Sequence, residues 1–212
     1  AEFYAPEIPV GIHLDHGKSF EIVKRAIAIG FTSIMYDGSR KNYEDNLMLT
    51  GEIASYCREK GVAVQAELGS VPYLGEENIG EVDWNKYMTD PGQAKQFAEM
   101  TGIDSLAVAI GNAHGFVKER KEPDYVRLEM INKNLGIPLV LHGATDWENG
   151  RVEEAIKRGI SCFNIDTAIR LAFTNNLIKK LRNEENISFD LRILLGDARE
   201  AVKGVVKEKI KI

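Results

Sequence analysis

Cysteine is scarce in this chain of 212 residues, and its two copies, Cys57 and Cys162, lie far apart with no metal-type spacing. This scarcity excludes the disulfide-rich scaffolds of small secreted proteins and the zinc sites that are built from cysteine pairs. We therefore expect two reduced cysteines and a cytoplasmic location.

Long apolar runs and an excess of positive charge are also missing. The apolar runs are far too short to cross a bilayer, which argues against a membrane protein. The formal net charge is −5 at pH 7, and no basic stripe is visible along the chain. Because nucleic acid is bound largely through its phosphates, this balance argues against a nucleic-acid-binding surface.

Short apolar runs alternate with amphipathic segments, which is typical of repeated βα units. The apolar runs do not alternate with polar residues, which favours strands that are covered on both faces in a parallel sheet. The strands are predicted at Ile8–Leu14, Ser33–Tyr36, Ala63–Ala66, Ser105–Ile110, Ile137–Leu141 and Cys162–Ile165. The helices are predicted near Phe20–Ile29, Tyr43–Glu59, Pro91–Thr101, Asp124–Asn134, Arg151–Arg158, Thr167–Arg182 and Asp197–Lys209.

The fold expected from this pattern is α/β. No composition break or low-complexity linker divides the chain, so we expect a single domain over residues 1–212. A closed (β/α)8 barrel, the TIM barrel, needs eight strands and about 250 residues. We therefore expect a TIM barrel without about two of its N-terminal βα units, with an open sheet as the alternative.

Histidine occurs four times, and every copy lies in or just after a predicted strand. His16, His114 and His142 follow three different strands, and the carboxyl ends of parallel strands meet at one face. Three neutral imidazoles suit a catalytic zinc and leave one coordination position open. One such histidine alone would more often be a half-buried structural residue, but three at equivalent positions favour a metal site. His13 is not counted as a ligand.

Three carboxylates reach the same predicted rim. Asp15 directly precedes His16, and beside a divalent metal it stays ionised and can pass a proton to a bound oxygen. Its alternative role is to orient a ligand histidine. Asp37 and Glu67 end the second and third strands, where they would orient histidines or hold a second cation. Capping of the following segment is an equally good interpretation of these two residues.

A candidate phosphate site follows the sixth predicted strand, where Asn164–Thr167 opens a helix. Exposed amides at a helix N-terminus bind anions, and barrel enzymes often hold a phosphate after their last strands. Gly143–Thr145 would supply further contacts. A plain helix cap is the alternative.

Six short motifs stand in a definite order along the chain. They are Ile12–Gly17 (IHLDHG), Met35–Ser39 (MYDGS), Ala66–Ser70 (AELGS), Ala109–Gly115 (AIGNAHG), Leu141–Gly143 (LHG) and Asn164–Thr167 (NIDT). This series resembles the class II, metal-dependent fructose/tagatose-bisphosphate aldolases. The similarity runs from about Ile8 to Ile210, and the lack of large insertions is closer to the shorter, tagatose-like branch.

The resemblance implies an enzyme that reversibly cleaves a ketose 1,6-bisphosphate, fructose or tagatose, to dihydroxyacetone phosphate and glyceraldehyde 3-phosphate. It implies Zn2+ on His16, His114 and His142, with Asp15 as the proton donor to the aldehyde oxygen. A glutamate on the loop after the third strand, Glu76 or Glu77, would act as the base.

The resemblance also implies the contacts to the phosphorylated sugar. These would come from Gly115, Gly143, Ala144, Thr145, Asn164, Ile165, Asp166 and Thr167, with Arg192 at the second phosphate. A monovalent cation, Na+ or K+, near the phosphate and a homodimer or homotetramer are further implications.

Two departures from the family pattern keep alternatives open. Pro72-Tyr73 replaces the usual loop glycine pair, and Asp146 stands where a glycine normally lies near phosphate. An aldolase for another phosphorylated ketose or keto acid is one alternative, and a non-catalytic binder of metal or sugar phosphate is another. A zinc hydrolase on the same barrel is a third, but a phosphate cradle would serve no purpose for a neutral substrate.

Overall fold

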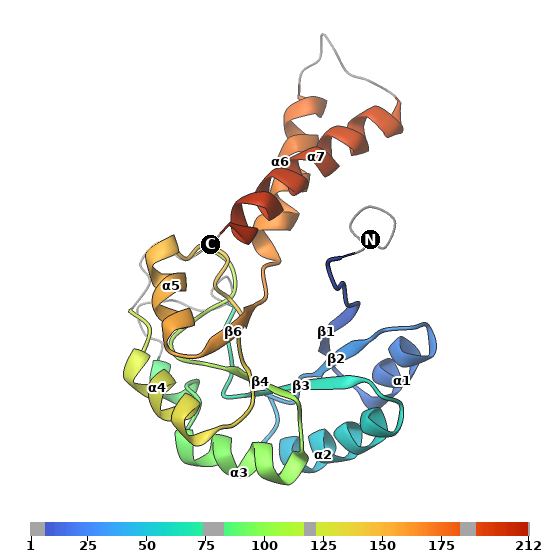
Figure 1. Ribbon diagram of the computed structural model, residues 1–212. Coiled ribbons are helices and arrows are strands. Elements are labelled where there is room, and N and C mark those ends of the chain that lie inside the picture. Colours follow the sequence, from blue (N-terminus) through green and yellow to red (C-terminus); the bar gives the residue numbers. More distant parts are fainter. Residues whose placement is uncertain (1–6, 74–82, 117–121, 183–189, 212) are drawn as a thin grey trace.

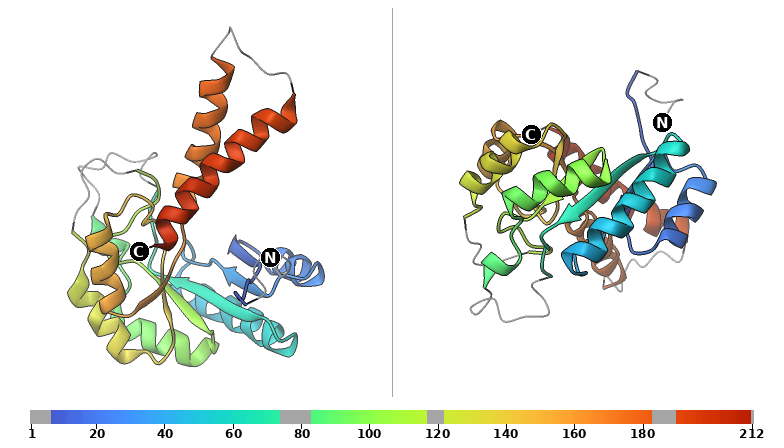
Figure 2. Two further views of the ribbon diagram at one scale, coloured as in Figure 1. Left: turned by 45° about the horizontal axis from the view of Figure 1, so that its top comes forward. Right: turned by 90° about the horizontal axis from the view of Figure 1, so that it is seen from below.

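The computed structural model describes residues 7–73, 83–116, 122–182 and 190–211. These residues form a curled parallel sheet with helices on its outer side and a helical hairpin that projects away from it (Figures 1 and 2). The six strands are β1 (His13–Gly17), β2 (Ser33–Tyr36), β3 (Ala63–Leu68), β4 (Ser105–Val108), β5 (Leu139–Leu141) and β6 (Ile160–Phe163). They lie in chain order, and every neighbouring pair is parallel.

The predicted α/β class and parallel sheet are confirmed. Within the described residues β1 pairs only with β2, and β6 pairs only with β5, so the sheet does not close. A curled sheet of parallel strands in chain order, with the helices outside, is the arrangement of a TIM barrel. The structure is therefore an open part of such a barrel.

The two faces of the sheet bury different side chains, because successive strand residues point to opposite faces. The outer face carries the main core cluster, in which Ile34, Val64, Leu106 and Leu139 pack against the helices. On the inner face Met35, Ala107 and Val140 form a small separate cluster. Polar side chains of the strands share this inner face, where they can approach one another.

Five helices cover the outer side: α1 (Phe20–Ala28), α2 (Tyr43–Glu59), α3 (Pro91–Thr101), α4 (Tyr125–Asn134) and α5 (Asn149–Lys157). A short 3-10 helix, η2 (Trp84–Lys86), precedes α3. Four of the five helices are capped at their N-termini by a side-chain oxygen that accepts a hydrogen bond from a backbone N–H of the first turn. The capping residues are Ser19, Asn42, Asp90 and Asp124. Gly102, with φ of 64°, ends α3 in the left-handed conformation.

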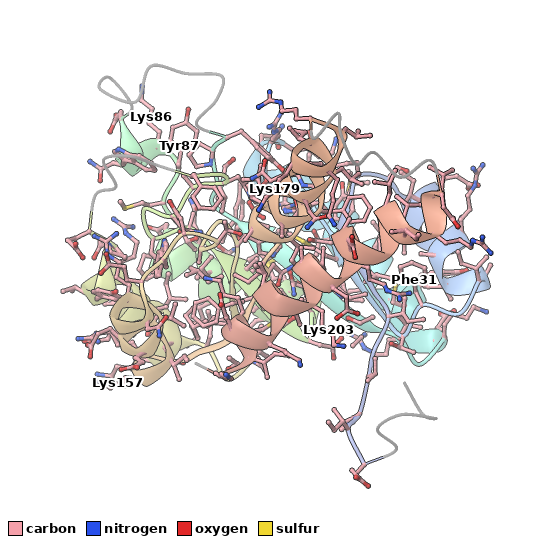
Figure 3. All side chains as sticks on the ribbon, turned by 90° about the horizontal axis from the view of Figure 1, so that it is seen from above. Phe31, Lys86, Tyr87, Lys157, Lys179 and Lys203 are labelled. Atoms are coloured by element: carbon pink, nitrogen blue, oxygen red, sulfur yellow. The ribbon has the colours of Figure 1, made fainter. Side chains whose placement is uncertain are left out.

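The last two helices, α6 (Thr167–Leu181) and α7 (Leu191–Ile210), form the projecting hairpin. Figure 3 looks down on it, with Lys179 labelled on α6 and Lys203 on α7. At the end of α7, Lys209 Nζ donates a hydrogen bond to the Thr145 carbonyl, at 3.0 Å. No described helix is both long and apolar enough to cross a membrane.

Three predicted boundaries are wrong, namely both ends of the first strand and the start of the last helix, while the others differ by at most two residues. The first strand begins at His13 rather than Ile8, because its parallel neighbour offers regular pairing only from Ser33 onward. The last helix begins at Leu191 rather than Asp197, since the Asp190 side chain caps it by accepting the Arg192 N–H. A cap contact of this kind extends a helix even with Gly196 in its interior.

Candidate active site

Side chains from several strand ends meet in one pocket on the inner side of the sheet. It is lined by Asp15, His16, Tyr73, His114, Gly115, His142, Gly143, Thr145, Asn164, Asp166 and Thr167. Ten of these eleven residues were predicted from the sequence as site residues. The pocket therefore unites the candidate metal ligands of three strands with the candidate phosphate loops.

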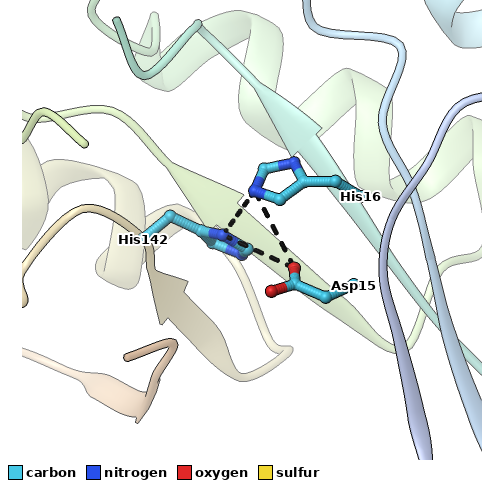
Figure 4. A group of neighbouring side chains, drawn as sticks. All are labelled: Asp15, His16 and His142. Carbon is cyan, nitrogen blue, oxygen red and sulfur yellow. Dashed lines mark hydrogen bonds and ion pairs between the residues drawn. The ribbon is translucent and has the colours of Figure 1, made fainter. Parts of the chain in front are cut away.

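His16, His142 and Asp15 point toward one another (Figure 4). The His16 Nε2 and His142 Nδ1 atoms are 3.0 Å apart. Asp15 Oδ1 lies 3.8 Å from the first nitrogen and 3.9 Å from the second. All three are potential metal ligand atoms, and they lie within 4.8 Å of one another, which suits a single bound cation.

His114 completes the histidine group from the loop after β4. Its ring centroid lies 5.4 Å from that of His16 and 6.3 Å from that of His142. The Tyr73 ring stacks on it at 4.3 Å between centroids. The backbone N–H of His114 donates to the Pro72 carbonyl at 2.9 Å, so the segment just after β3 supports this histidine.

Burial sets the charge of two of the three histidines. Burial and, next, the neighbouring His16 together lower the pKa of His142 to about 3 and that of His114 to about 4. Both imidazoles are therefore neutral near pH 7 and keep the lone pair that a metal requires. At His16 burial opposes the charged form, but the Asp37 hydrogen bond and the Glu67 charge outweigh it, so its pKa is raised.

Asp37 holds the opposite side of the His16 ring. Its Oδ2 atom is 2.7 Å from His16 Nδ1 and also accepts from Lys18 Nζ, while Oδ1 accepts from the Ser39 N–H and hydroxyl. Burial acts to raise the pKa of Asp37, but these hydrogen bonds lower it well below its usual range. An ionised carboxylate only accepts, so His16 carries its proton on Nδ1 and directs Nε2 into the pocket.

Glu67 lies next to this pair and has one unsatisfied oxygen. Its side chain is almost fully buried; Oε1 accepts the Val71 N–H, whereas Oε2 has no partner in the described part of the chain. Burial and the Asp37 charge raise the pKa of Glu67 to about 7. His16, Asp37 and Glu67 form a second group of ligand atoms within 4.8 Å. A buried carboxylate oxygen without a partner fits a nearby cation.

Two backbone features bring the loops together. His16 has φ of 50°, a left-handed conformation that is rare for residues other than glycine and that directs its ring to the pocket. Gly143 has φ of 65°, and a Cβ there would lie 2.5 Å from the Ala113 carbonyl carbon. Glycine at this position allows the loops that carry His114 and His142 to touch.

The predicted phosphate segment lies at the start of α6. Asn164 Nδ2 donates to Asp15 Oδ1 at 3.3 Å, and Asp166 forms an ion pair with Arg170 at 2.8 Å. The Asp166 side chain makes no capping hydrogen bond to the α6 backbone. Asp166 and Thr167 line the pocket, so the segment contributes to it as well as starting a helix.

Other predicted site residues lie apart from the pocket lining. Ala144 and Ile165 neighbour it in sequence without lining it. Arg192 is on α7, almost fully exposed, and pairs with Asp190 at 2.7 Å. Glu76 and Glu77 lie outside the described residues.

The sequence assigned no role to two residues that contact the histidines. Tyr73 was noted only as a replacement for a loop glycine, and its stacking depends on a loop geometry that the sequence does not specify. Gln65 Oε1 lies 2.9 Å from His142 Nε2. Its spacing was informative, because it lies two residues before Glu67 and therefore on the same face of β3.

Comparison with known proteins accounts for this arrangement. A family model described as class II fructose-bisphosphate aldolase matches residues 1–212. The chain belongs to the class II fructose-bisphosphate aldolase family. A fructose-bisphosphate aldolase of Staphylococcus aureus (strain Mu50) is 42% identical over 204 residues, which are 96% of this chain and 70% of the relative. One of Helicobacter pylori is 37% identical over 230 residues, covering 98% of this chain and 74% of the relative.

A solved structure agrees with the sequence comparison. The crystal structure of the YdjI aldolase from Escherichia coli K12 superposes with a TM-score of 0.79 at 33% identity. The superposition covers 98% of this chain and 70% of that structure. The aldolase family and the partial-barrel fold that the motifs predicted are thus confirmed, and the chain belongs to a family of carbon–carbon lyases.

Proposed function

We propose that the chain acts as a zinc-dependent aldolase that reversibly cleaves fructose 1,6-bisphosphate to dihydroxyacetone phosphate and glyceraldehyde 3-phosphate. The observation that carries the proposal is the convergence of His16 Nε2, His142 Nδ1 and Asp15 Oδ1 within 3.9 Å, beside loops suited to phosphate. The fructose substrate is preferred because the named relatives are fructose-bisphosphate aldolases. Tagatose 1,6-bisphosphate is the other substrate to test.

The residues fit a zinc ion. His16, His114 and His142 would hold it, since neutral imidazoles on three strands are the ligand set of a catalytic zinc. The partnerless Glu67 oxygen and the Asp37 carboxylate add negative charge close by. Bound zinc would supply a Lewis acid for the ketone carbonyl of the substrate.

Asp15 is the proposed proton-transfer residue. The Asp15 side chain is about half exposed. Its Oδ1 atom accepts a hydrogen bond from Asn164 and faces the histidine nitrogens. In condensation the protonated carboxyl would donate its proton to the aldehyde oxygen, which becomes the C4 hydroxyl of the ketose. In cleavage the carboxylate would take the proton back from this hydroxyl as the C3–C4 bond breaks. Glu76 or Glu77 is proposed as the base that acts on the carbon acid.

The phosphate end of the substrate would lie against the glycine loops and the start of α6. Gly115, Gly143 and Thr145 come from two loops, and Asp166 and Thr167 from the third. The first-turn amides of a 15-residue helix favour an anion there. We extend the proposal to the Ala144 and Ile165 backbone, to Arg192 at the second phosphate, and to a Na+ or K+ ion near the first.

Oligomerisation into a homodimer or homotetramer is a further part of the proposal. It is supported by exposed apolar side chains on the α6–α7 hairpin, including Ile178, Leu191 and Ile193. Light scattering after size-exclusion chromatography would measure the assembly.

The central experiment measures cleavage of fructose and tagatose 1,6-bisphosphates side by side, before and after chelation and with zinc added back. We expect cleavage of the fructose substrate, its loss on chelation and its return with zinc. Asp15→Asn should lower kcat by about 10²- to 10⁴-fold, whereas Asp45→Asn, on the outer helix α2, should leave it unchanged. Full activity after zinc removal, or in Asp15→Asn, would refute the assignment.

A second candidate function, cleavage of another phosphorylated ketose or keto acid, can be tested in the same assay. Asp146 follows the Gly143–Thr145 loop, where its charge would disfavour a phosphate of standard placement. Zinc binding without cleavage of either bisphosphate would favour an aldolase for another phosphorylated ketose or keto acid.

A further inference from the structure

Gln65 contacts the most deeply buried of the three pocket histidines. Gln65 lies on β3 and is 6% exposed, two residues before Glu67 on the inner face of the sheet. Its Oε1 atom is 2.9 Å from His142 Nε2, a contact between residues 77 positions apart. His142 itself is 1% exposed, so water does not compete for this contact.

The contact decides which nitrogen of His142 carries the proton. A neutral imidazole has one N–H and one lone pair, and an amide oxygen can only accept. His142 Nε2 therefore donates to Gln65, and Nδ1 keeps its lone pair. That lone pair faces His16 Nε2 at 3.0 Å and Asp15 Oδ1 at 3.9 Å (Figure 4).

His16 is oriented by the same principle through a different partner. Asp37 accepts from its Nδ1 atom, so that Nε2 faces the pocket. The two rings thus present opposite nitrogens, Nε2 of one and Nδ1 of the other, to a common point. A carboxylate, Asp37, orients the ring of His16, while a neutral amide, Gln65, orients the more deeply buried ring of His142.

We propose that Gln65 is a positioning residue that holds His142 in its Nε2–H tautomer and so presents Nδ1 as a zinc ligand. The inference rests on the proposed zinc-dependent function, and it assigns to Gln65 a contribution that a merely space-filling polar residue would not make. Partners that orient a ligand histidine typically contribute about 10- to 100-fold to metal affinity.

The test compares Gln65→Leu, which removes the acceptor at similar volume, with Gln65→Glu, which restores one. Zinc dissociation constants are measured by competition with a chromogenic chelator, and the His142 tautomer by ¹⁵N NMR of the metal-free protein. We expect Gln65→Leu to weaken zinc binding by about 10- to 100-fold and to populate the Nδ1–H tautomer. Gln65→Glu should recover the Nε2–H tautomer and most of the affinity.

Thr101→Val is the matched control, because Thr101 is equally buried but its hydroxyl donates to the Phe97 carbonyl within α3. It should leave both zinc affinity and tautomer unchanged. If Gln65→Leu does not fold, Gln65→Asn replaces it, since that variant keeps an amide but withdraws the oxygen by one methylene. It should shift both readouts in the same direction.

The possible outcomes distinguish a failure of the role proposed for Gln65 from a failure of the proposed zinc-dependent function. Wild-type zinc affinity and an Nε2–H His142 in Gln65→Leu would overturn the role of Gln65 while leaving the zinc site intact. A wild-type chain that binds no zinc would instead refute the proposed function. In that case the tautomer difference between the wild type and Gln65→Leu still decides what Gln65 does.

Discussion

The sheet, together with its outer helices, buries many apolar side chains, whereas the α6–α7 hairpin buries few. In the sheet and its outer helices, residues such as Ile34, Leu106 and Phe97 are fully buried in one continuous core. In the hairpin, no described α6 residue is buried, and α7 buries only Leu194 and Ala198. The sheet is thus stabilised by its own core, whereas the hairpin relies on contacts between its two helices.

The pocket draws on these two regions unequally. The three lining histidines and Asp15 come from the sheet and its loops, as do Asp37 and Glu67 next to His16, whereas Asp166 and Thr167 come from the start of the hairpin. A metal site needs ligands held within a few tenths of an ångström, which a packed core provides. The candidate metal site is accordingly built on the well-packed region, and the hairpin contributes at its base.

The largest expected difference between the regions is in stability. Phe97→Ala removes a fully buried ring and should lower the free energy of unfolding by about 3–5 kcal/mol. Ile178→Ala, at a half-exposed position of α6, should lower it by less than about 1 kcal/mol. Chemical denaturation measures both. Equal losses would mean that the hairpin is as integral to the core as α3.

The next largest expected effect is a dependence of the free energy of unfolding on pH, which comes from Glu67 in the sheet. Because the pKa of folded Glu67 is raised to about 7, the folded metal-free protein keeps a proton that the unfolded chain loses near pH 4.5. Stability is therefore lost as pH rises between these values, and Glu67→Gln avoids this loss. Its advantage over the wild type should grow by up to about 1.4 kcal/mol per pH unit from pH 4.5 to 7.

Denaturation in the presence of a chelator at several pH values tests this expectation. Glu200→Gln, at an exposed position of α7, is the control and should show a difference from the wild type that does not change with pH. A constant difference for Glu67→Gln as well would contradict the raised pKa.

A smaller effect probes the hairpin directly. Asp190→Ala removes the N-cap of α7 and should cost about 1 kcal/mol. If the hairpin opens separately from the sheet, hydrogen exchange should accelerate at α7 amides and not at those of β2–β4. Asp90→Ala, the equivalent change at α3, should instead affect the sheet region. Acceleration throughout the chain in Asp190→Ala would show that the two regions unfold together.

The smallest effect concerns the contact that joins the hairpin to the pocket. Lys209→Met removes the hydrogen bond to the Thr145 carbonyl and should cost less than about 1 kcal/mol of stability. Because Thr145 lines the pocket, KM for the sugar bisphosphate should rise by about two- to fivefold. Lys203→Met, whose lysine pairs with Glu200 on the surface, is the control. An unchanged KM in Lys209→Met would separate the end of α7 from substrate binding.

Much of the fold could be predicted because its determinants are local. Uninterrupted apolar runs marked the strands, and the caps at Asn42 and Asp90 stand where the predicted helices begin. The last helix begins at Leu191, before its predicted start at Asp197, because the Asp190 side chain caps it. The exposed character of α6 could not be read from its apolar content, since helical periodicity does not say whether a partner surface exists.

In the candidate site too, some features could be predicted from the sequence and others could not. Strand ends at one face are a consequence of parallel topology, so the positions of His16, His114 and His142 sufficed to predict that they would gather. The roles of Asp37 and Glu67 stayed open, because orienting a histidine and capping a loop need the same residue type. The structure shows Asp37 bonded to His16 and Glu67 with a partnerless oxygen.

The sequence by itself determined the order of βα units, the parallel sheet and the family, because each depends on patterns a few residues long. Only the tertiary structure decided which nitrogen of each histidine faces the pocket. His16 and His142 are 126 residues apart, and Gln65 and His142 are 77 apart. The orientation of each ring depends on hydrogen-bond partners on other strands, and these meet only when the sheet curls.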